Sequence, residues 1–397
     1  MKLSPSRRQF LKVAGGSLLT AGMAPAILGA EDKAGTRPVV VGEGEFQYEC
    51  HHNWGQLPPG IVWKNTHGTA IDQDGLIYVT HQGTAAAPCD TVVVFDPHGK
   101  FVRSFGKEYA GGGHGISIRN EGGTEYLYLS NTGLKSVVKC TKTGEIIWSK
   151  LTPAEPHLYD DPSPEQVKAA RAAGKNPPKK PNYSPTNICF GTNGDFYVGD
   201  GYGSSYLHQY NQDGKWIRSW GGAGTEAGKM KTPHGQWLDT RRGTPRLVIA
   251  DRANARLQYF SLDGKPLEVF QGIPVSHKEK SGHQENLAGA NGINIPMTYV
   301  YGLSFPADID TQGDLMLVPD LHARVILMNE KNQIVANLGF DEDWTAKVLD
   351  GFKIRLQPEA WPAGKFVHPH DACFDAAGNI YVAEWVDKGR LTFLKKV

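Results

Sequence analysis

Short hydrophobic runs separated by Gly-centred turns dominate the chain beyond residue 60. A typical unit reads HGTAIDQDGLIYVT, in which an alternating run, an Asp-rich turn at Gly75 and a second apolar run follow one another. Alternation with a period of two predicts strands, and Asp-Gly pairs between such runs predict hairpin turns. Long helical periodicities are scarce, so the pattern indicates an all-β fold.

This unit recurs six times along the chain. The copies begin near His67, His114, Thr186, His234, Ala307 and His370. Where copies follow one another directly, the interval of about 47 residues suits four short strands with their turns. Six such units predict a six-bladed β-propeller, whereas a β-helix would need a much shorter repeat.

Two insertions interrupt the repeat. The first, residues 151–184, contains a predicted short helix that Ser163 caps, with Pro164 at its first position, Gln166 completing the capping box and Gly174 after its end. The second begins at residue 273 and is rich in Gly and Asn. We expect it to form a loop over one mouth of the propeller.

The last copy ends at Val397 with little room for a fourth strand. In closed propellers a segment from the other terminus often completes a blade, and GEFQYECHH, which starts at Gly44, has the pattern of a strand. We therefore expect residues 44–397 to form one closed NHL-type propeller and residues 31–43 to be a linker.

Residues 1–30 have the pattern of an export signal. Arg7 and Arg8 precede QFLK and a moderately apolar run that is rich in Gly and Ala. This pattern predicts a twin-arginine signal peptide, cleaved after Ala30, and a periplasmic or extracellular location for a protein that folds before export. A membrane-spanning helix is the alternative, but the run is short and contains Gly and Pro, so we expect no membrane span after cleavage.

The charge limits the classes of partner that we expect, and the cysteine content limits the kind of metal site. The net charge of +1 provides no concentrated basic face, so we expect no nucleic-acid partner and consider a small molecule or a peptide terminus as substrate. The five cysteines include no CxxC pair, which argues against a zinc-thiolate site. We interpret them mostly as core residues.

Histidine occupies an equivalent position in several copies. The first strand of each blade lines the channel, so His114, His234 and His370, in the second, fourth and sixth copies, should converge on one point. Three neutral imidazoles and an open position form a catalytic Zn²⁺ site. The alternative is a repeat consensus that serves hydrogen bonding, since His67 in the first copy lies outside the alternating set. By alternation His368 shares a face with His370, as a further polar group near the metal.

Asp371 would point away from His370 along the same strand. Its carboxylate and the backbone carbonyl of Ile116 could together hold Ca²⁺, a hard cation that prefers oxygen ligands. A turn-forming or blade-bridging role for Asp371 is equally open.

Four stretches carry a resemblance to a known family. They read FYVGDGYGSSYLHQYNQDGKWIRSWG, TPHGQWL, LVIADRANARLQYFSLDGK and HPHDACFDAAGNIYVAE. Together they resemble the catalytic domain of peptidyl-α-hydroxyglycine α-amidating lyase, an NHL-repeat six-bladed propeller, over roughly residues 60–397 apart from the insertions. The resemblance implies a lyase that splits a C-terminal α-hydroxyglycine into a peptide amide and glyoxylate, with a channel zinc and a structural calcium.

By motif position the resemblance also implies roles for individual residues. Three histidines match the zinc ligands and two residues match calcium contacts, namely His114, His234 and His370 for zinc, and Asp371 and the carbonyl of Ile116 for calcium. Tyr202 in DGYG matches the catalytic tyrosine, and Arg256 in DRANAR matches an active-site arginine. From the residues alone, Tyr202 could instead line the channel mouth. Asp251, Arg252 and Arg256 could instead form a blade-to-blade ion pair and anchor loops.

The chain departs from the family pattern in two places. Gln82, in THQGTAAAP, stands near the position where the family has an arginine for the substrate carboxylate and hydroxyl. The matching stretches cover the lyase domain alone, so the resemblance implies a separate monooxygenase partner. The uncharged Gln82 predicts weak binding of substrates with a free carboxylate.

Three functions follow from this sequence. We favour an exported zinc-dependent lyase in which the metal polarises an oxygen and Tyr202 moves a proton. The alternative is a non-catalytic NHL propeller with a structural metal and a ligand-binding loop face. A calcium-dependent sugar-lactone hydrolase is disfavoured, because such sites use carboxylate and Asn ligands rather than three imidazoles.

The export signal generates the first testable prediction. Replacing Arg7 and Arg8 with Lys should trap the precursor in the cytoplasm, because the twin-arginine pair is the recognised feature of the signal. Cell fractionation followed by immunoblotting measures this, and unchanged export of the variant would contradict the assignment.

Overall fold

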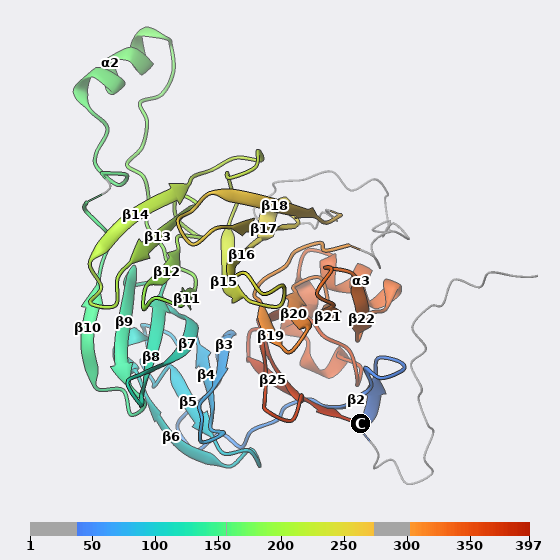
Figure 1. Ribbon diagram of the computed structural model, residues 1–397. Coiled ribbons are helices and arrows are strands. Elements are labelled where there is room, and N and C mark those ends of the chain that lie inside the picture. The colour runs from blue at the N-terminus through green and yellow to red at the C-terminus, as the bar shows by residue number, and fades with distance from the viewer. Residues whose placement is uncertain (1–37, 156, 274–301) are drawn as a thin grey trace, which may run out of the picture.

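The computed structural model describes residues 38–155, 157–273 and 302–397. These residues form six antiparallel sheets arranged as blades around a central axis, as the repeat predicts (Figure 1). The protein is therefore an all-β, six-bladed β-propeller. The predicted export signal and most of the second insertion lie outside the described residues.

Blades 1 to 5 are four-stranded meanders whose first strands lie around the axis (Figure 1). The strands of blades 1 and 2 are β3 (Thr66–Ile71), β4 (Ile77–His81), β5 (Val92–Phe95), β6 (Phe101–Phe105), β7 (Gly113–Glu121), β8 (Thr124–Asn131), β9 (Ser136–Thr141) and β10 (Ile146–Lys150). Those of blades 3 and 4 are β11 (Ile188–Phe190), β12 (Phe196–Gly199), β13 (Tyr206–Tyr210), β14 (Trp216–Gly221), β15 (Pro233–Asp239), β16 (Arg246–Asp251), β17 (Arg256–Phe260) and β18 (Pro266–Gln271). Those of blade 5 are β19 (Asp310–Gln312), β20 (Leu315–Asp320), β21 (Arg324–Met328) and β22 (Ile334–Leu338).

Blade 6 joins the two ends of the described chain. Its strands, in spatial order, are β1 (Val39–Val41), β2 (Tyr48–His51), β25 (Arg390–Lys396), β24 (Ile380–Glu384) and β23 (Pro369–Phe374). The β2–β25 pairing, with Cys50 opposite Leu394, supplies the closing strand expected from the segment after Gly44. β1 extends this sheet into residues 39–41, within the segment expected to be a linker.

The helical segments lie in connections between strands. They are η1 (Lys107–Tyr109), α2 (Pro164–Ala172), η2 (Arg252–Asn254), α3 (Glu342–Leu349), η4 (Lys353–Leu356) and η5 (Pro358–Ala360). α2 has the predicted capping box, in which the Ser163 hydroxyl accepts from the backbone N–H of Gln166 and the Gln166 side chain accepts from that of Ser163.

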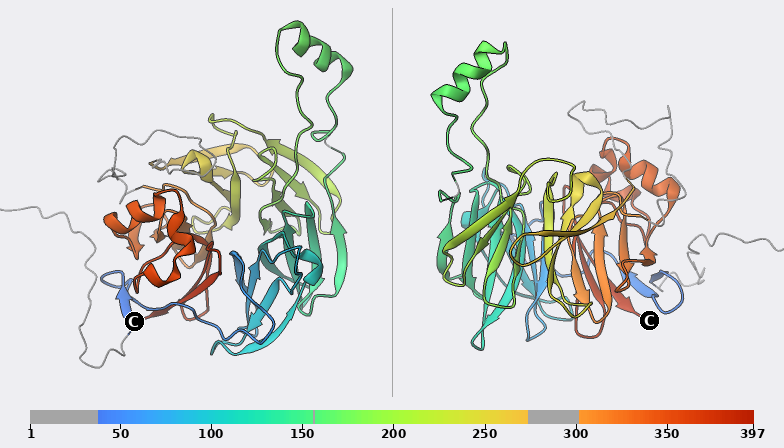
Figure 2. Two further views of the ribbon diagram at one scale, coloured as in Figure 1. Left: turned by 180° about the vertical axis from the view of Figure 1, so that it is seen from behind. Right: turned by 45° about the horizontal axis from the view of Figure 1, so that its top comes forward.

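One end of the ring carries the longest connections. We call it the loop face, the end at which the innermost strands β3, β7, β11, β15, β19 and β23 begin. Because neighbouring strands alternate in direction, the links from second to third strands and from one blade to the next all lie there. The insertion with α2 and the segment with α3 both rise from this side (Figure 2).

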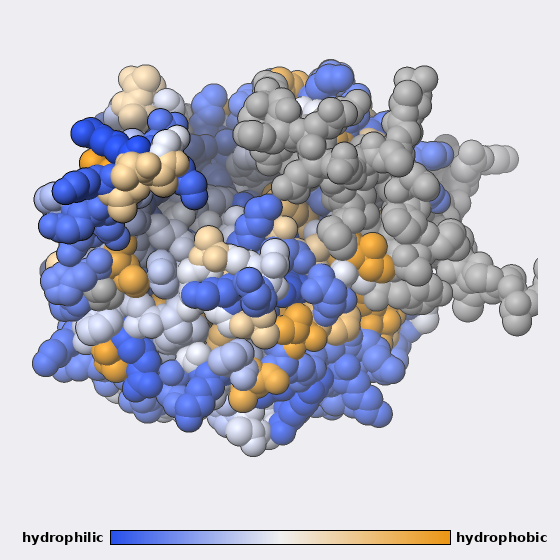
Figure 3. Space-filling model, turned by 90° about the horizontal axis from the view of Figure 1, so that it is seen from above, coloured by the Kyte–Doolittle hydropathy of each residue, from blue (hydrophilic) through white to orange (hydrophobic). Residues whose placement is uncertain are grey.

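The side seen in Figure 3 is mostly hydrophilic, with small hydrophobic groups between the hydrophilic residues. Within the described ranges, no helix combines the length and the apolar character that crossing a membrane requires.

Four of the five cysteines are buried, Cys89 is partly exposed and all five are free thiols, so their interpretation as mostly core residues is confirmed.

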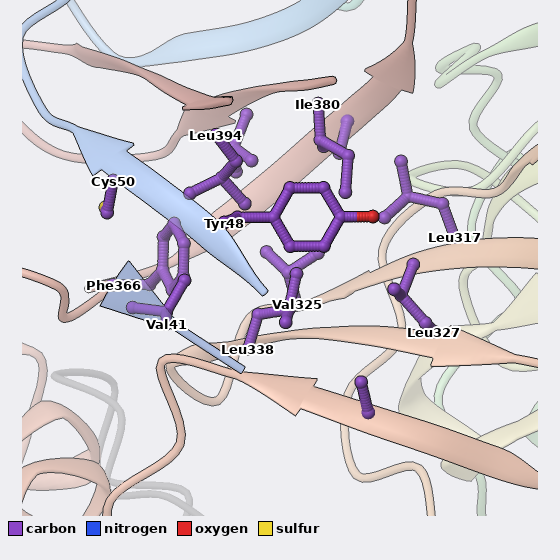
Figure 4. Close-up of a cluster of buried hydrophobic side chains, with 13 residues drawn as sticks. Val41, Tyr48, Cys50, Leu317, Val325, Leu327, Leu338, Phe366, Ile380 and Leu394 are labelled. Carbon is purple, nitrogen blue, oxygen red and sulfur yellow. The ribbon is translucent and has the colours of Figure 1, made fainter. Parts of the chain in front are cut away.

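The core consists of one hydrophobic cluster at each interface between adjacent blades. Central strands such as β4 and β5 are buried along their whole length, because each blade packs on both faces. The outermost strand β10 is largely exposed. In the cluster between blades 5 and 6, Tyr48 of the closing strand inserts among side chains of both blades, including Leu317 and Leu394 (Figure 4).

Buried ion pairs fix several turns on the loop face. Each joins the end of a second strand to the start of the third, as in Asp251–Arg256, with 2.6 Å between Oδ2 and Nε, and Glu384–Arg390, with 2.6 Å between Oε2 and Nη2. Burial of both partners means that removing one would leave an unpaired charge in the interior. The ion pair expected as one alternative for Asp251 is therefore present, but it joins two strands of blade 4 rather than two blades.

Ring closure generates the second prediction. Tyr48→Ala should lower the free energy of unfolding by about 3–5 kcal/mol, because it removes a buried aromatic side chain and leaves a cavity between two blades. Urea unfolding measures the change, with Val62→Ala, at a 65% exposed position, as the control. A loss below about 1 kcal/mol would show that the closing strand contributes little.

Candidate metal centre

Four histidines occupy the second position of an innermost strand. They are His67 in β3, His114 in β7, His234 in β15 and His370 in β23, and all are buried. The strand pairing is irregular at each of these positions. Such irregularities redirect side chains, here toward the axis at the loop-face end of the channel.

The glycine that follows three of these histidines has a steric reason. A Cβ on Gly115 would collide with the carbonyl oxygen of Thr186, and one on Gly235 would collide with Asp308. The innermost strands approach so closely at this level that only a residue without a side chain fits. The glycine of each His-Gly pair therefore allows the innermost strands to pack closely, and this close packing brings the imidazoles together.

The imidazoles converge as the alternating repeat predicts. The ring centroid of His114 lies 5.0 Å from that of His234 and 4.9 Å from that of His370, and the His234 and His370 centroids are 4.6 Å apart. His67, which the alternation set aside, belongs to the same group, because its centroid lies 4.7 Å from those of His114 and His370. Its position in the repeat was the available signal, since every blade points this position at the axis.

Backbone carbonyls fix the orientation of three rings. Nδ1–H of His114 donates to the Thr186 oxygen at 2.7 Å, that of His234 to the Ala307 oxygen at 2.7 Å, and that of His370 to the His67 oxygen at 2.8 Å. These acceptors come from blades 3, 5 and 1, so the blades alternate between imidazole donor and carbonyl acceptor. Metal-binding histidines use the same arrangement, which leaves the Nε2 lone pair free for the ion.

Burial keeps these rings neutral. It lowers the pKa of His114 to about 3 and holds the pKa values of His234 and His370 well below the ordinary value. Neutral imidazole is the form that binds a metal. Nε2 of His370 has no hydrogen-bond partner among the described residues, although it is buried. Uncharged nitrogen donors with an unpartnered atom fit a zinc ion.

Tyr202 lies at the group from the loop-face turn between β12 and β13. Its hydroxyl oxygen is 3.0 Å from Nε2 of His234 and 3.4 Å from Nε2 of His114. The side chain is partly open to solvent, at 39% exposed. The structure therefore places Tyr202 where a group bound beside the imidazoles would meet its hydroxyl.

The Tyr202 turn is anchored by the first insertion. The Asp200 carboxylate accepts from the backbone N–H groups of Ser184 and Ser204, each at 2.6 Å, and from the Tyr159 hydroxyl at 2.8 Å. The backbone N–H of Tyr202 donates to the carbonyl of Ser184. Residues of the insertion thus hold the turn over the channel.

The arginine beside Tyr202 is Arg252, which the sequence did not single out. Its Nη1 donates to the Tyr202 hydroxyl at 3.3 Å, and its guanidinium lies 5.1 Å from the ring centroids of Tyr202 and Phe305. Arg256, the residue expected in this role, is instead held by Asp251 and by the carbonyls of Thr225, Glu226 and Lys229. The physical reason is position, because Arg256 opens a strand whereas Arg252 lies in the connecting turn.

Gln82 also has a charged neighbour from a distant segment. Asn65 Nδ2 donates to Gln82 Oε1 at 2.8 Å, and Arg355 Nη2 donates to Asn65 Oδ1 at 2.9 Å. The Arg355 guanidinium stacks 3.3 Å from the ring centroid of Trp385. Burial lowers the pKa of Arg355 to about 10, and the charge of nearby Asp387 acts in the opposite direction. The Arg355 guanidinium is therefore linked through Asn65 to Gln82, the position where the sequence alone shows only an uncharged amide.

His368 packs against the rings of Phe352 and Trp385 and its Nδ1–H donates to the carbonyl of Leu321 at 2.7 Å. It is buried at the loop-face end of the channel wall. The imidazole that accompanies the predicted triad in the structure is that of His67.

Oxygen donors form the next layer of the channel. Asp371, Ile116, Asn187 and Asp308 all line a cavity of about 490 Å³. Asp371 accepts from the backbone N–H of Thr69 at 2.9 Å, and Asp308 accepts from Asn187 Nδ2 at 2.5 Å. Burial, followed by the charge of Asp371, raises the pKa of Asp308 well above the ordinary value. Two adjacent buried carboxyl groups suit a hard cation such as Ca²⁺, and Asp308 adds a donor that the sequence did not indicate.

Comparisons with known proteins agree with this architecture. No protein-family model matches the chain. The rat peptidylglycine α-amidating monooxygenase is 26% identical over 249 residues, which cover 56% of this chain and 23% of the rat protein. The mouse protein is 27% identical over the same length. The chain is similar to amidating enzymes. It spans less than a quarter of the length of these relatives.

Solved structures show the fold alone. A gluconolactonase from Xanthomonas campestris has a TM-score of 0.52 at 10% identity and covers 94% of this chain and 95% of its own. A catalytically inactive virginiamycin B lyase from Staphylococcus aureus has a TM-score of 0.50 at 12% identity and covers 88% of this chain and all of its own. At these identities the likeness extends to the propeller and not to the chemistry.

Proposed function

We propose that this protein is a zinc-dependent lyase, similar to the amidating lyase domain, that cleaves a small hydroxylated substrate or a hydroxylated peptide terminus. The observation that carries the proposal is the convergence of three imidazoles whose Nδ1 atoms are fixed by carbonyls, with Tyr202 at 3.0 Å from one of them. The distant similarity to amidating monooxygenases supports the choice of reaction. We further propose that it acts outside the cytoplasm, on the basis of the twin-arginine pattern.

Nε2 atoms of His114, His234 and His370 would hold the zinc ion. When bound, zinc would supply Lewis acidity, polarising a substrate oxygen and stabilising negative charge on it. The oxygen layer around Asp371, Ile116 and Asp308 would hold calcium as a structural ion. Such an ion would relieve the repulsion between the two carboxylates and connect innermost strands from different blades.

Tyr202 and Arg252 carry the proton transfer in this proposal. Tyr202 acts in the proposal as the phenolate: its oxygen takes the proton of the substrate hydroxyl, the C–O bond becomes a carbonyl, the C–N bond breaks, and the tyrosine returns the proton to the nitrogen of the released amide. Arg252 donates a hydrogen bond to the same oxygen and stabilises its negative charge before the transfer. For an α-hydroxyglycine the products are an amide and glyoxylate, so atoms and charges balance without a further reactant.

The channel also contains carboxylate and amide oxygens, but the group that Tyr202 contacts consists of imidazoles. The donor set beside Tyr202 therefore does not favour the gluconolactonase-like alternative. The non-catalytic binding propeller remains the competing function. It predicts a bound metal without turnover, so the next measurement separates the two.

Tyr202→Phe should lower the turnover number for an N-acyl α-hydroxyglycine by about 10²-fold or more, the usual scale for a lost general acid or base. Glyoxylate release measures turnover, and metal analysis should show unchanged zinc. Tyr206→Phe, in the strand that follows the same turn, is the matched control. Equal rates for wild type and Tyr202→Phe would remove the tyrosine from the mechanism, and no turnover by zinc-loaded wild type on hydroxylated substrates would favour the binding propeller.

Arg355 changes the expected substrate charge. Gln82 alone predicts weak binding of carboxylates, but the neighbouring guanidinium offers a planar donor that suits a carboxylate. Arg355→Gln should therefore raise KM for an N-acyl α-hydroxyglycine about 10-fold, as loss of a hydrogen bond to a charged group does. The KM of the corresponding carboxamide should not change.

Lys353→Gln, an exposed cation in the same helical segment, is the control for general charge effects. An equal effect of Arg355→Gln on the acid and the carboxamide would contradict a direct role in carboxylate binding.

A further inference from the structure

His67 shares the centre with the predicted triad but differs from it in its hydrogen bonding. One ring nitrogen from each of His67, His114 and His370 can be chosen so that all three lie within 4.8 Å of one another. His114 and His370 are likewise neighbours of His234. The same two imidazoles are therefore common to two overlapping triplets.

The unpartnered nitrogen of His67 is Nδ1. This atom is buried and has no hydrogen-bond partner within 3.5 Å among the described residues, although the Asn65 backbone lies near the ring, whereas Nδ1 of each triad histidine donates to a carbonyl. An unsatisfied buried polar atom costs about 1–3 kcal/mol, and a bound ion is one of the partners that would remove this cost. The triad thus presents Nε2 to the centre, and His67 can present Nδ1.

The surroundings keep His67 in place. Its backbone carbonyl accepts the Nδ1–H of His370, so moving the His67 main chain would also disturb a triad ligand. Thr66, the preceding residue, is tied through its hydroxyl to the carbonyl of Glu384 at 2.6 Å.

We propose that His67 is a fourth protein ligand, through Nδ1, of the ion held by His114, His234 and His370. The proposal rests on the proposed function only for the presence of an ion, and it goes beyond a three-histidine site. Four protein ligands complete a tetrahedral zinc ion, whereas three leave a position open. The substrate-free site is then closed, and His67 controls whether a small external molecule reaches the ion.

X-ray absorption spectroscopy of the zinc-loaded full chain tests the ligand count. The wild type should show four imidazole ligands, and His67→Ala should show three imidazoles with a light oxygen or nitrogen atom from solvent. Chelator competition should show a zinc dissociation constant at least about 10-fold higher for His67→Ala, since even loss of residues outside the ligand set costs 10-fold or more.

Cobalt-substituted protein provides a second readout. Azide should leave the visible absorption spectrum of the wild type unchanged and should shift that of His67→Ala, because only the variant has an accessible position. His81→Gln is the matched control. His81 is a buried histidine of the same blade whose Nδ1 accepts from Lys64 N–H and whose Nε2 lies 2.8 Å from the carbonyl of Asp90.

Three imidazoles in the wild type, or an unchanged dissociation constant in His67→Ala, would overturn the proposal. The X-ray absorption spectrum of the wild type gives the number of imidazole ligands even if the variant fails to fold. His67→Gln provides a less disruptive replacement. A zinc-loaded wild type with four imidazoles and no turnover would support this proposal while contradicting the proposed lyase. A wild type that binds no zinc would overturn both.

Discussion

Strand β2 lies near the N-terminal end of the described chain and pairs with β25 at its C-terminal end, and this pairing closes the ring. Closure arranges the innermost strands around one axis, so that the second residues of β3, β7, β15 and β23, all histidines, are brought to the same small volume. Without a closed ring the histidines at positions 67 and 370 would have no fixed relation, because they belong to the first and last blades. Tyr48 reinforces the pairing by filling the interface between blades 5 and 6.

In the channel, different blades supply different chemical groups to the histidine centre. Blades 2, 4 and 6 supply an imidazole, and blades 3, 5 and 1 supply the carbonyl that orients it. The next layer provides carboxylate and amide oxygens instead. Nitrogen donors and oxygen donors therefore occupy different levels of the channel, and in our proposal each level holds a different cation.

Much of the fold and of the histidine centre can be predicted from the sequence, because both depend on patterns of neighbouring residues within each repeat. Six copies of one unit predict six blades, Ser163 and Gln166 predict the helix cap, and the short final copy predicts a strand from the N-terminal side. The convergence of His114, His234 and His370 follows from their equivalent positions.

What the sequence did not show depends on contacts between distant segments. Arg355 reaches Asn65 from another connection, a relation that no motif encodes. Arg252 and Arg256 are four residues apart in one motif, and only the turn between β16 and β17 decides which of them faces Tyr202. His67 was set aside by the alternation argument, although side chains from adjacent blades also meet at the axis.

Diffraction data collected on either side of the zinc absorption edge test the central claim, which is that the channel histidines hold a metal ion. We predict one strong anomalous peak about 2.0–2.1 Å from Nε2 of His114, His234 and His370 in crystals of the protein purified without added metal. An empty histidine centre, or a peak only at another position, would contradict the account.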